Sequence, residues 1–166
     1  MILMFNIFVW VCIHLTISYM TSRFSPAFLQ KVSFIFRPLT YELDGPFYAR
    51  LKIRKWKAYL PDAGGWFRSG MKKNQIGLSS DSGRETFLRE LDRAELSHWL
   101  QMLPAPLFFI QNNGMLSWVM FSYGIFFNLP LILVQRYNRI RILRVIKHSV
   151  SSKNQEVPLH SKTPHF

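Results

Sequence analysis

The chain has 166 residues, enough for one small domain, and combines 49 % hydrophobic residues with a formal net charge of +12. Its single cysteine, Cys12, excludes an intramolecular disulfide and a cysteine-based metal cluster. The basic balance would suit a nucleic-acid binder, but all Lys, Arg, Asp and Glu lie in residues 23–95 and 136–166, next to apolar runs, so the positive-inside rule explains the charge without a nucleic-acid partner.

The first predicted element is a membrane span over residues 1–22. This segment has no charged side chain, and at about 1.5 Å per residue it is long enough to cross the hydrocarbon core of a bilayer. A cleaved signal peptide is the alternative, although a positively charged start and an A-x-A-like cleavage site are both missing. The many charges after the span predict an outward N-terminus and a cytoplasmic segment from Arg23 onward.

Residues 23–95 are predicted to form a cytoplasmic basic segment with interfacial helices. Gly- and Pro-containing turns divide it into short pieces. Residues 47–59 mix aromatic and basic side chains at helix-compatible spacing, which predicts a helix on the membrane surface. Residues 84–99 repeat apolar side chains at steps of three and four, which predicts a helix that runs into the membrane.

Residues 96–135 contain no charged side chain and are predicted to form a membrane hairpin. The turn is expected at Gln111-Asn112-Asn113-Gly114, the strongest turn-forming cluster of the run. The longer second limb is a full span. Pro104 and Pro106 interrupt the first limb, which is therefore either a kinked span or a re-entrant segment.

Residues 136–166 are predicted to form a basic cytoplasmic tail, disordered after about residue 148, where Ser, Lys and Pro become frequent. The predicted fold is thus mainly α: a small integral protein of the cell membrane with an N-terminal span, a cytoplasmic basic segment and a C-terminal membrane hairpin. The hairpin brings the polar clusters at its two ends, residues 93–99 and 135–139, to the same membrane face. We predict the functional site there.

Glu95 and His98 are the candidate catalytic pair. They are three residues apart, so on a helix they share a face, and a carboxylate beside an imidazole fixes its tautomer and raises its basicity, as a general base requires. In the alternative, Glu95 pairs with Arg93 or Arg89, and His98 only marks the membrane interface. The Glu-x-x-His pattern has no second copy, so we predict neither a metal site nor a cofactor.

The second polar cluster offers groups that bind phosphates, carboxylates or sugar hydroxyls. Such residues are also ordinary topology anchors at the cytoplasmic end of a span. A polar side chain within an apolar limb is expected to face the bundle interior. The predicted substrate-binding residues are Arg93, Trp99, Asn128, Gln135, Arg136, Tyr137, Asn138 and Arg139.

The chain resembles the glycosyl-4,4'-diaponeurosporenoate acyltransferases over about residues 23–144. The motifs that carry the likeness are Arg54-Lys55-Trp56-Lys57 with Leu60-Pro61-Asp62, Arg93-Ala94-Glu95-Leu96-x-His98-Trp99, Asn128-x-Pro130 and Gln135-Arg136-Tyr137-Asn138-Arg139-x-Arg141. The resemblance implies a membrane acyltransferase that esterifies the glucose 6-hydroxyl of a glycosylated C30 carotenoid with a fatty acyl group. This is the last step of staphyloxanthin-type carotenoid synthesis.

The partners implied by the resemblance are a glycosylated carotenoid, a fatty acyl donor carried on coenzyme A or acyl carrier protein, membrane lipid, and other enzymes of the carotenoid pathway. We expect His98 to act as base on the sugar hydroxyl with Glu95 as its orienting carboxylate. Arg136 and Asn138 are expected to stabilise the oxyanion or bind a phosphate of the donor. The basic run 54–57 lies on lipid headgroups or gathers an anionic donor. The alternative function is a non-enzymatic membrane scaffold or regulator anchored by basic clusters.

Overall fold

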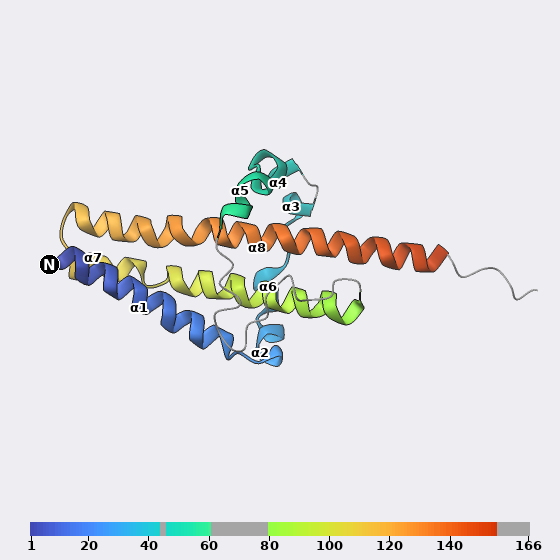
Figure 1. Ribbon diagram of the computed structural model, residues 1–166, viewed down its shortest axis with the longest axis horizontal. Helices are drawn as coiled ribbons and strands as arrows, with labels where there is room; N and C mark the ends of the chain where they lie inside the picture. Colours follow the sequence, from blue (N-terminus) through green and yellow to red (C-terminus); the bar gives the residue numbers. More distant parts are fainter. Residues whose placement is uncertain (44–45, 61–79, 156–166) are drawn as a thin grey trace, which may run out of the picture.

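The computed structural model describes residues 1–43, 46–60 and 80–155, and every regular element within these ranges is a helix (Figure 1). The prediction of a mainly α fold is therefore confirmed. The long helices are α1 (Ile2–Ser22), α6 (Asp81–Met102) and α8 (Met115–Gln155). The short elements are α2 (Pro26–Lys31), η1 (Ser33–Phe36), α3 (Thr40–Leu43), α4 (Pro46–Arg50), α5 (Ile53–Trp56), η2 (Lys57–Tyr59), η5 (Ala105–Leu107) and α7 (Phe108–Gln111).

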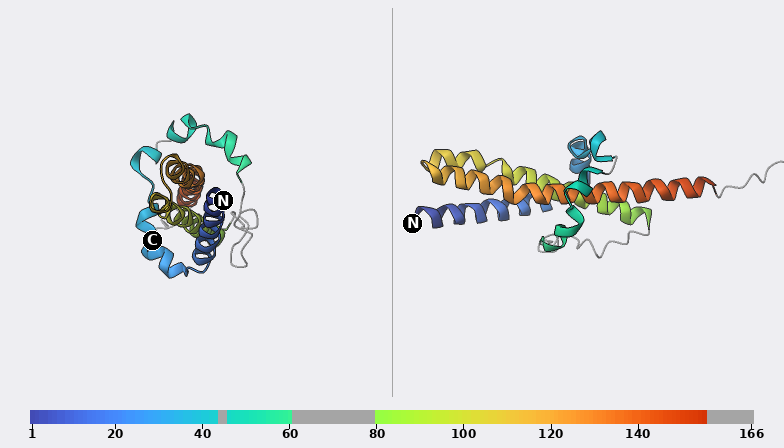
Figure 2. Two further views of the ribbon diagram at one scale, coloured as in Figure 1. Left: turned by 90° about the vertical axis from the view of Figure 1, so that its left-hand side faces the viewer. Right: turned by 90° about the horizontal axis from the view of Figure 1, so that it is seen from above.

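The three long helices lie side by side as a bundle, and the short helices α2 to α5 surround its middle (Figures 1 and 2). We call these surrounding helices the collar. The N-terminus and the turn before α8 lie at one end of the bundle, and the last turns of α8 lie at the other (Figure 1). The collar therefore divides the bundle into two halves.

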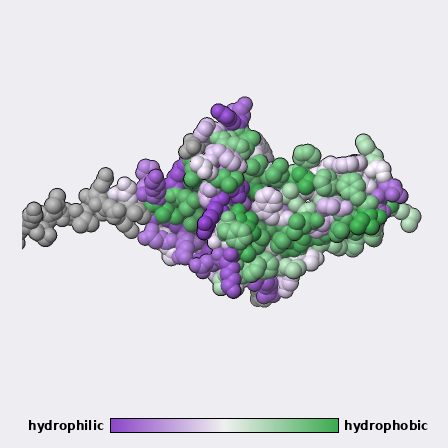
Figure 3. All heavy atoms as spheres, turned by 180° about the vertical axis from the view of Figure 1, so that it is seen from behind, coloured by the Kyte–Doolittle hydropathy of each residue, from purple (hydrophilic) through white to green (hydrophobic). Residues whose placement is uncertain are grey.

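The two halves of the bundle differ in polarity (Figure 3). Apolar side chains cover the half that contains α1, whereas hydrophilic residues gather at the collar and beyond it. Two helices are long and apolar enough to cross a membrane, α1 and the Met115–Ser149 part of α8. Only 11 % of the apolar window of α1 is buried within the molecule, so most of its apolar surface is exposed.

The first limb of the hairpin is a kinked stretch of helix. α6 ends at Met102, and Pro104 and Pro106 interrupt its continuation before the short elements η5 and α7. Gly114 takes a positive φ of 61° in the predicted turn, which confirms that turn. Asn112 exchanges side-chain hydrogen bonds of 2.7 and 3.2 Å with Asn6 of α1. The limb therefore extends to the end of the bundle where α1 begins.

The surface segment over residues 47–59 is not one helix. Lys52 takes a left-handed conformation with φ 50°, which separates α4 from α5. On one continuous helix, Tyr48 and Ile53 would lie about 140° apart. The break allows both side chains to be buried against Ile140 of α8. The burial of these two side chains offsets the free energy cost of the left-handed conformation at Lys52.

The helix predicted over residues 84–99 is confirmed within α6. Its first turn is capped by Ser80, whose hydroxyl accepts a hydrogen bond of 3.0 Å from the backbone N–H of Gly83. Phe87 and Leu91 of this helix pack against Ile142 of α8. The packing holds α6 and α8 together well beyond the apolar half of the bundle.

The tail differs from the prediction. Disorder was expected after about residue 148, but α8 continues as helix to Gln155. The reason is packing, since α6 extends far enough to cover Ile142 and Ile146 and so supports the continuation of α8. The rest of the predicted disordered tail, residues 156–166, and the Gly- and Ser-rich residues 61–79 lie outside the described residues.

Candidate active site

A buried ion-pair network joins α6, α8 and the collar. At its centre, Glu95 is 0 % exposed; its Oε1 accepts from Nη1 of Arg136 at 2.8 Å, and its Oε2 accepts from Nη1 of Arg139 at 2.5 Å. Arg136 also makes a bidentate pair with Glu42 at 2.7 and 2.8 Å, and Arg139 donates to Asp92 at 2.5 Å. Two guanidinium groups thus share three carboxylates, which compensates for the burial of charge.

The carboxylates of this network differ in their protonation equilibria. Burial raises the pKa of Glu42, but hydrogen bonds from Arg136, Tyr48 and the Leu39 N–H outweigh it and hold that pKa at about 2. Burial also raises the pKa of Tyr48, and the carboxylate of Glu42 adds to the effect. Burial raises the pKa of Asp92 against the opposing effect of its arginine partner. Glu42 is therefore firmly ionised, and Tyr48 is a neutral donor to it.

The two arginines also hold the backbone of the collar. Arg136 donates through Nη2 to the carbonyl oxygen of Arg37 at 3.3 Å, and Arg139 donates through Nη1 to that of Phe36 at 3.0 Å. The Phe36 ring centroid lies 5.4 Å from Cζ of Arg139. The contacts of the two arginines with three carboxylates and two carbonyls anchor the collar, and substrate binding by Arg136 and Arg139 stays a prediction.

His98 lies one turn beyond Glu95 on α6 and faces α8. Its Nδ1 lies 3.0 Å from Oδ1 of Asn128, a fully buried residue. The Nδ2 of Asn128 donates to the carbonyl oxygen of Gly124 at 2.9 Å, which fixes the amide so that its oxygen faces the imidazole. Because an amide oxygen can only accept, this contact requires a proton on Nδ1 of His98, and in the neutral imidazole Nε2 is then the basic nitrogen. Asn128 is thus a partner that orients the imidazole, and the orienting role of Glu95 stays a prediction.

Trp99 on α6 and Gln135 on α8 are two further predicted substrate-binding residues. Trp99 is 39 % exposed, and its Nε1 donates to Oε1 of Glu95 at 3.4 Å. Trp99 therefore contacts the ion-pair network and is partly exposed at the outer surface. Gln135 is buried on α8, one residue before Arg136.

Arg93 has a positioning role. Its Nη1 donates to the carbonyl oxygens of Thr21, Ser22 and Phe24 at 3.2, 2.7 and 3.1 Å. These groups lie at the C-terminal end of α1, where backbone carbonyls lack helical partners and a positive charge is favourable. These contacts fix the end of α1 on α6, and substrate binding by Arg93 stays a prediction.

Tyr137 and Asn138 contact α4 and η2. The Nζ of Lys57 donates to Oδ1 of Asn138 at 3.2 Å and lies 4.9 Å from the ring centroid of Tyr137. The ring of Tyr137 also meets that of Tyr48 edge-on, with centroids 5.7 Å apart. These two predicted substrate-binding residues therefore belong to a separate surface from His98 and Asn128.

The sequence analysis missed Glu42, Tyr48 and Asp92. Asp92 could have been predicted from spacing, because it precedes Glu95 by three residues, as Arg136 precedes Arg139. This spacing places two carboxylates on one face of a helix and two guanidinium groups on one face of another. Glu42 and Tyr48 lie in short helices without a clear period. Within the ranges that the structure describes, no group of three or more His, Cys, Asp or Glu side chains is arranged to hold a metal ion.

Comparison with known proteins gives one consistent match. The family model described as glycosyl-4,4'-diaponeurosporenoate acyltransferase matches residues 31–148. A protein of that name from Staphylococcus aureus (strain bovine RF122 / ET3-1) is 28 % identical over 141 residues, covering 83 % of this chain and 84 % of the relative. Another from Staphylococcus haemolyticus (strain JCSC1435) is 32 % identical over 134 residues, covering 80 % and 78 %. No solved structure matches at a significant level.

Proposed function

Because this chain belongs to the glycosyl-4,4'-diaponeurosporenoate acyltransferase family, we propose that it transfers a fatty acyl group to the glucose 6-hydroxyl of a glycosylated C30 carotenoid. The family match over residues 31–148 carries the proposal. That range contains His98, Asn128 and all members of the ion-pair network. The chain is an acyltransferase of carotenoid synthesis, and the exact acceptor atom is the part that we propose.

We assign His98 as the general base. Asn128 holds the imidazole in the tautomer whose Nε2 is basic, which is the state that can accept a proton from a hydroxyl. In the proposed step, Nε2 takes the proton of the sugar hydroxyl while the hydroxyl oxygen bonds to the acyl carbonyl carbon. The tetrahedral intermediate then breaks its bond to the sulfur of a thioester donor, and the imidazolium returns the proton to the departing thiolate.

The ion-pair network lies one turn of α6 from the contact between His98 and Asn128 and holds the two helices there. Glu95 ties α6 to Arg136 and Arg139 of α8, so the relative position of the two helices is fixed next to the place where His98 meets Asn128. We therefore propose Glu95 as a positioning residue. Trp99, exposed beside His98, is the aromatic ring that we propose to stack on the sugar.

The polarity of the bundle suits amphiphilic substrates. A carotenoid and a fatty acyl chain both have apolar tails, and exposed apolar side chains cover the α1 half of the molecule (Figure 3). A site near the border of that half lets the tails remain in lipid while the polar ends meet. We propose that residues 1–22 and 96–135 lie in the cell membrane and that the charged segments 23–95 and 136–166 face the cytoplasm.

The test is an acylation assay in membranes. Membranes that contain the expressed chain, a glucosylated C30 carotenoic acid and a fatty acyl donor are analysed by mass spectrometry for an added acyl ester. His98→Ala should abolish the ester, whereas His148→Ala, an exposed histidine on α8, should retain it. If wild-type protein that is normally inserted forms no ester, a scaffold role or a different acceptor is correct; if His98→Ala keeps full activity, His98 is not the base.

A further inference from the structure

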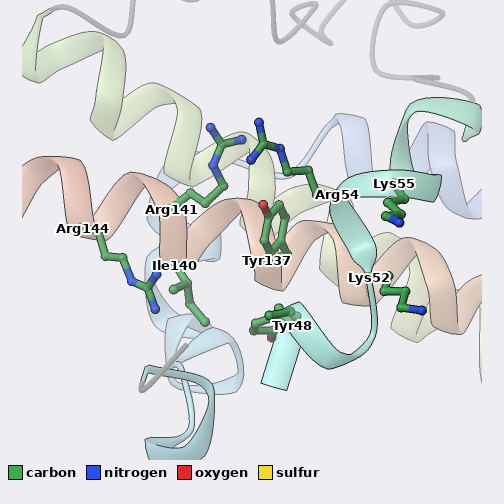
Figure 4. Close-up of a pocket in the computed structure, with 9 residues that line it drawn as sticks. Tyr48, Lys52, Arg54, Lys55, Tyr137, Ile140, Arg141 and Arg144 are labelled. Atoms are coloured by element: carbon green, nitrogen blue, oxygen red, sulfur yellow. The ribbon is translucent and has the colours of Figure 1, made fainter. Parts of the chain in front are cut away.

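A strongly basic pocket lies where the collar meets α8, away from His98. It has a volume of about 360 Å³ and is formed by α4, α5 and the face of α8 that follows Arg136 (Figure 4). We call it the basic pocket. Its lining residues are Tyr48, Ala49, Lys52, Arg54, Lys55, Tyr137, Ile140, Arg141 and Arg144. Five of these side chains are cationic and none is acidic.

Among the described residues, no carboxylate neutralises the charge of the basic pocket. None of its five cations forms an ion pair with a carboxylate in the described part of the chain. Figure 4 shows the guanidinium groups of Arg54 and Arg141 facing each other above Tyr137. At the edge of the pocket, burial together with the charges of Arg141 and Arg54 lowers the pKa of Lys57. Like charges gathered in this way favour an anion between them.

The backbone at Lys52 determines where the cations of α5 lie. Lys52, which lines the pocket, takes the left-handed conformation that separates α4 from α5. Here it turns the chain between α4 and α5, so that Arg54 and Lys55 border the same pocket as Arg141.

We propose that the basic pocket binds the phosphate groups of the acyl donor, a thioester of the coenzyme A type. This proposal rests on the proposed acyltransferase function. The several phosphate charges of coenzyme A match the several cations of the pocket that have no described carboxylate partner. Guanidinium groups bind phosphate oxygens with two parallel hydrogen bonds. A single lipid phosphate would leave most of the pocket's charge uncompensated.

Direct binding provides the test. The full chain, purified in neutral detergent, is titrated with coenzyme A, and binding is measured by calorimetry. The double variant Arg54→Ala/Arg141→Ala should weaken binding about 10- to 100-fold, as expected for the loss of charge-assisted hydrogen bonds. The control Lys31→Ala/Lys147→Ala removes the same charge from exposed sites outside the pocket and should change affinity by less than about threefold.

Two results would overturn the proposal: no binding of coenzyme A by the wild-type chain, or equal binding by the pocket variant. A second titration uses a short-chain phosphatidylglycerol. If the wild-type chain binds this lipid, the pocket variant does not, and coenzyme A fails to displace it, the pocket binds lipid instead. The acylation assay separates the two hypotheses. If coenzyme A binds in the pocket but no ester forms, the proposed function fails alone; if an ester forms and the pocket variant leaves the donor KM unchanged, the pocket assignment fails alone.

Discussion

Replacing Glu95 with glutamine tests whether the buried network holds α6 on α8. The substitution hardly changes side-chain volume, but Gln keeps one acceptor oxygen and turns its NH₂ group toward the other guanidinium. Removing one partner of a buried ion pair costs about 3–5 kcal/mol. Arg136 keeps Glu42 and Arg139 keeps Asp92 as partners, so we expect the lower end, about 3 kcal/mol. That is a large share of the 5–15 kcal/mol typical of a folded domain.

The free energy of unfolding is measured by titrating the purified chain in mixed micelles with SDS and following helix content by circular dichroism. Glu85→Gln is the matched control on the same helix, because its ion pair with Arg89 is solvent-accessible, with side chains 70 % and 40 % exposed. This control should change stability by less than about 0.5 kcal/mol. Equally small losses for both variants would refute the view that the network around Glu95 fastens the helices.

Three further predictions follow from single contacts. Gly124→Ala would place Cβ 2.6 Å from Cη2 of Trp10, so the SDS titration should show a loss of about 1–3 kcal/mol. Asn128→Ala removes the acceptor that orients His98, and the rate of ester formation per inserted protein should fall about 100-fold, the lower end of what general-base catalysis contributes. The pKa of Glu42 is lowered from 4.5 to about 2 in the folded protein, so its stabilisation is complete above the unfolded value and is lost as pH falls toward 2. Melting temperatures should decrease over that pH window, and less steeply for Glu42→Gln.

Some features of the fold follow directly from the sequence because they depend on local chemistry. A long uncharged run must be buried in lipid or protein, and Gly114 marks the place where the run can reverse with a positive φ. The step of three residues between Glu95 and His98 correctly places both on a face of α6 that meets α8. Their partners could not be read in this way, because helical periodicity identifies a face and not the residue opposite to it.

The collar shows the limit of sequence reasoning most clearly. Glu42 is separated from Arg136 by 94 positions in the chain, and it lies in a four-residue helix that has no period to detect. The left-handed turn at Lys52 is equally hidden, since lysine has no preference for that conformation and adopts it because Tyr48 and Ile53 are both buried. Tertiary packing decides both features.

The four arginines after the apolar part of α8 illustrate how packing assigns roles within one basic run. Arg136 and Arg139 point into the bundle, where three carboxylates compensate their charge. Arg141 and Arg144 each lie five residues further on, about 140° around the helix, and line the basic pocket. The positive-inside rule treats these four residues alike. Because Arg141 and Arg144 have no carboxylate partner among the described residues, the attraction for an anion at this end of α8 is concentrated in the pocket, and Arg136 and Arg139 determine where α6, and with it His98, is held.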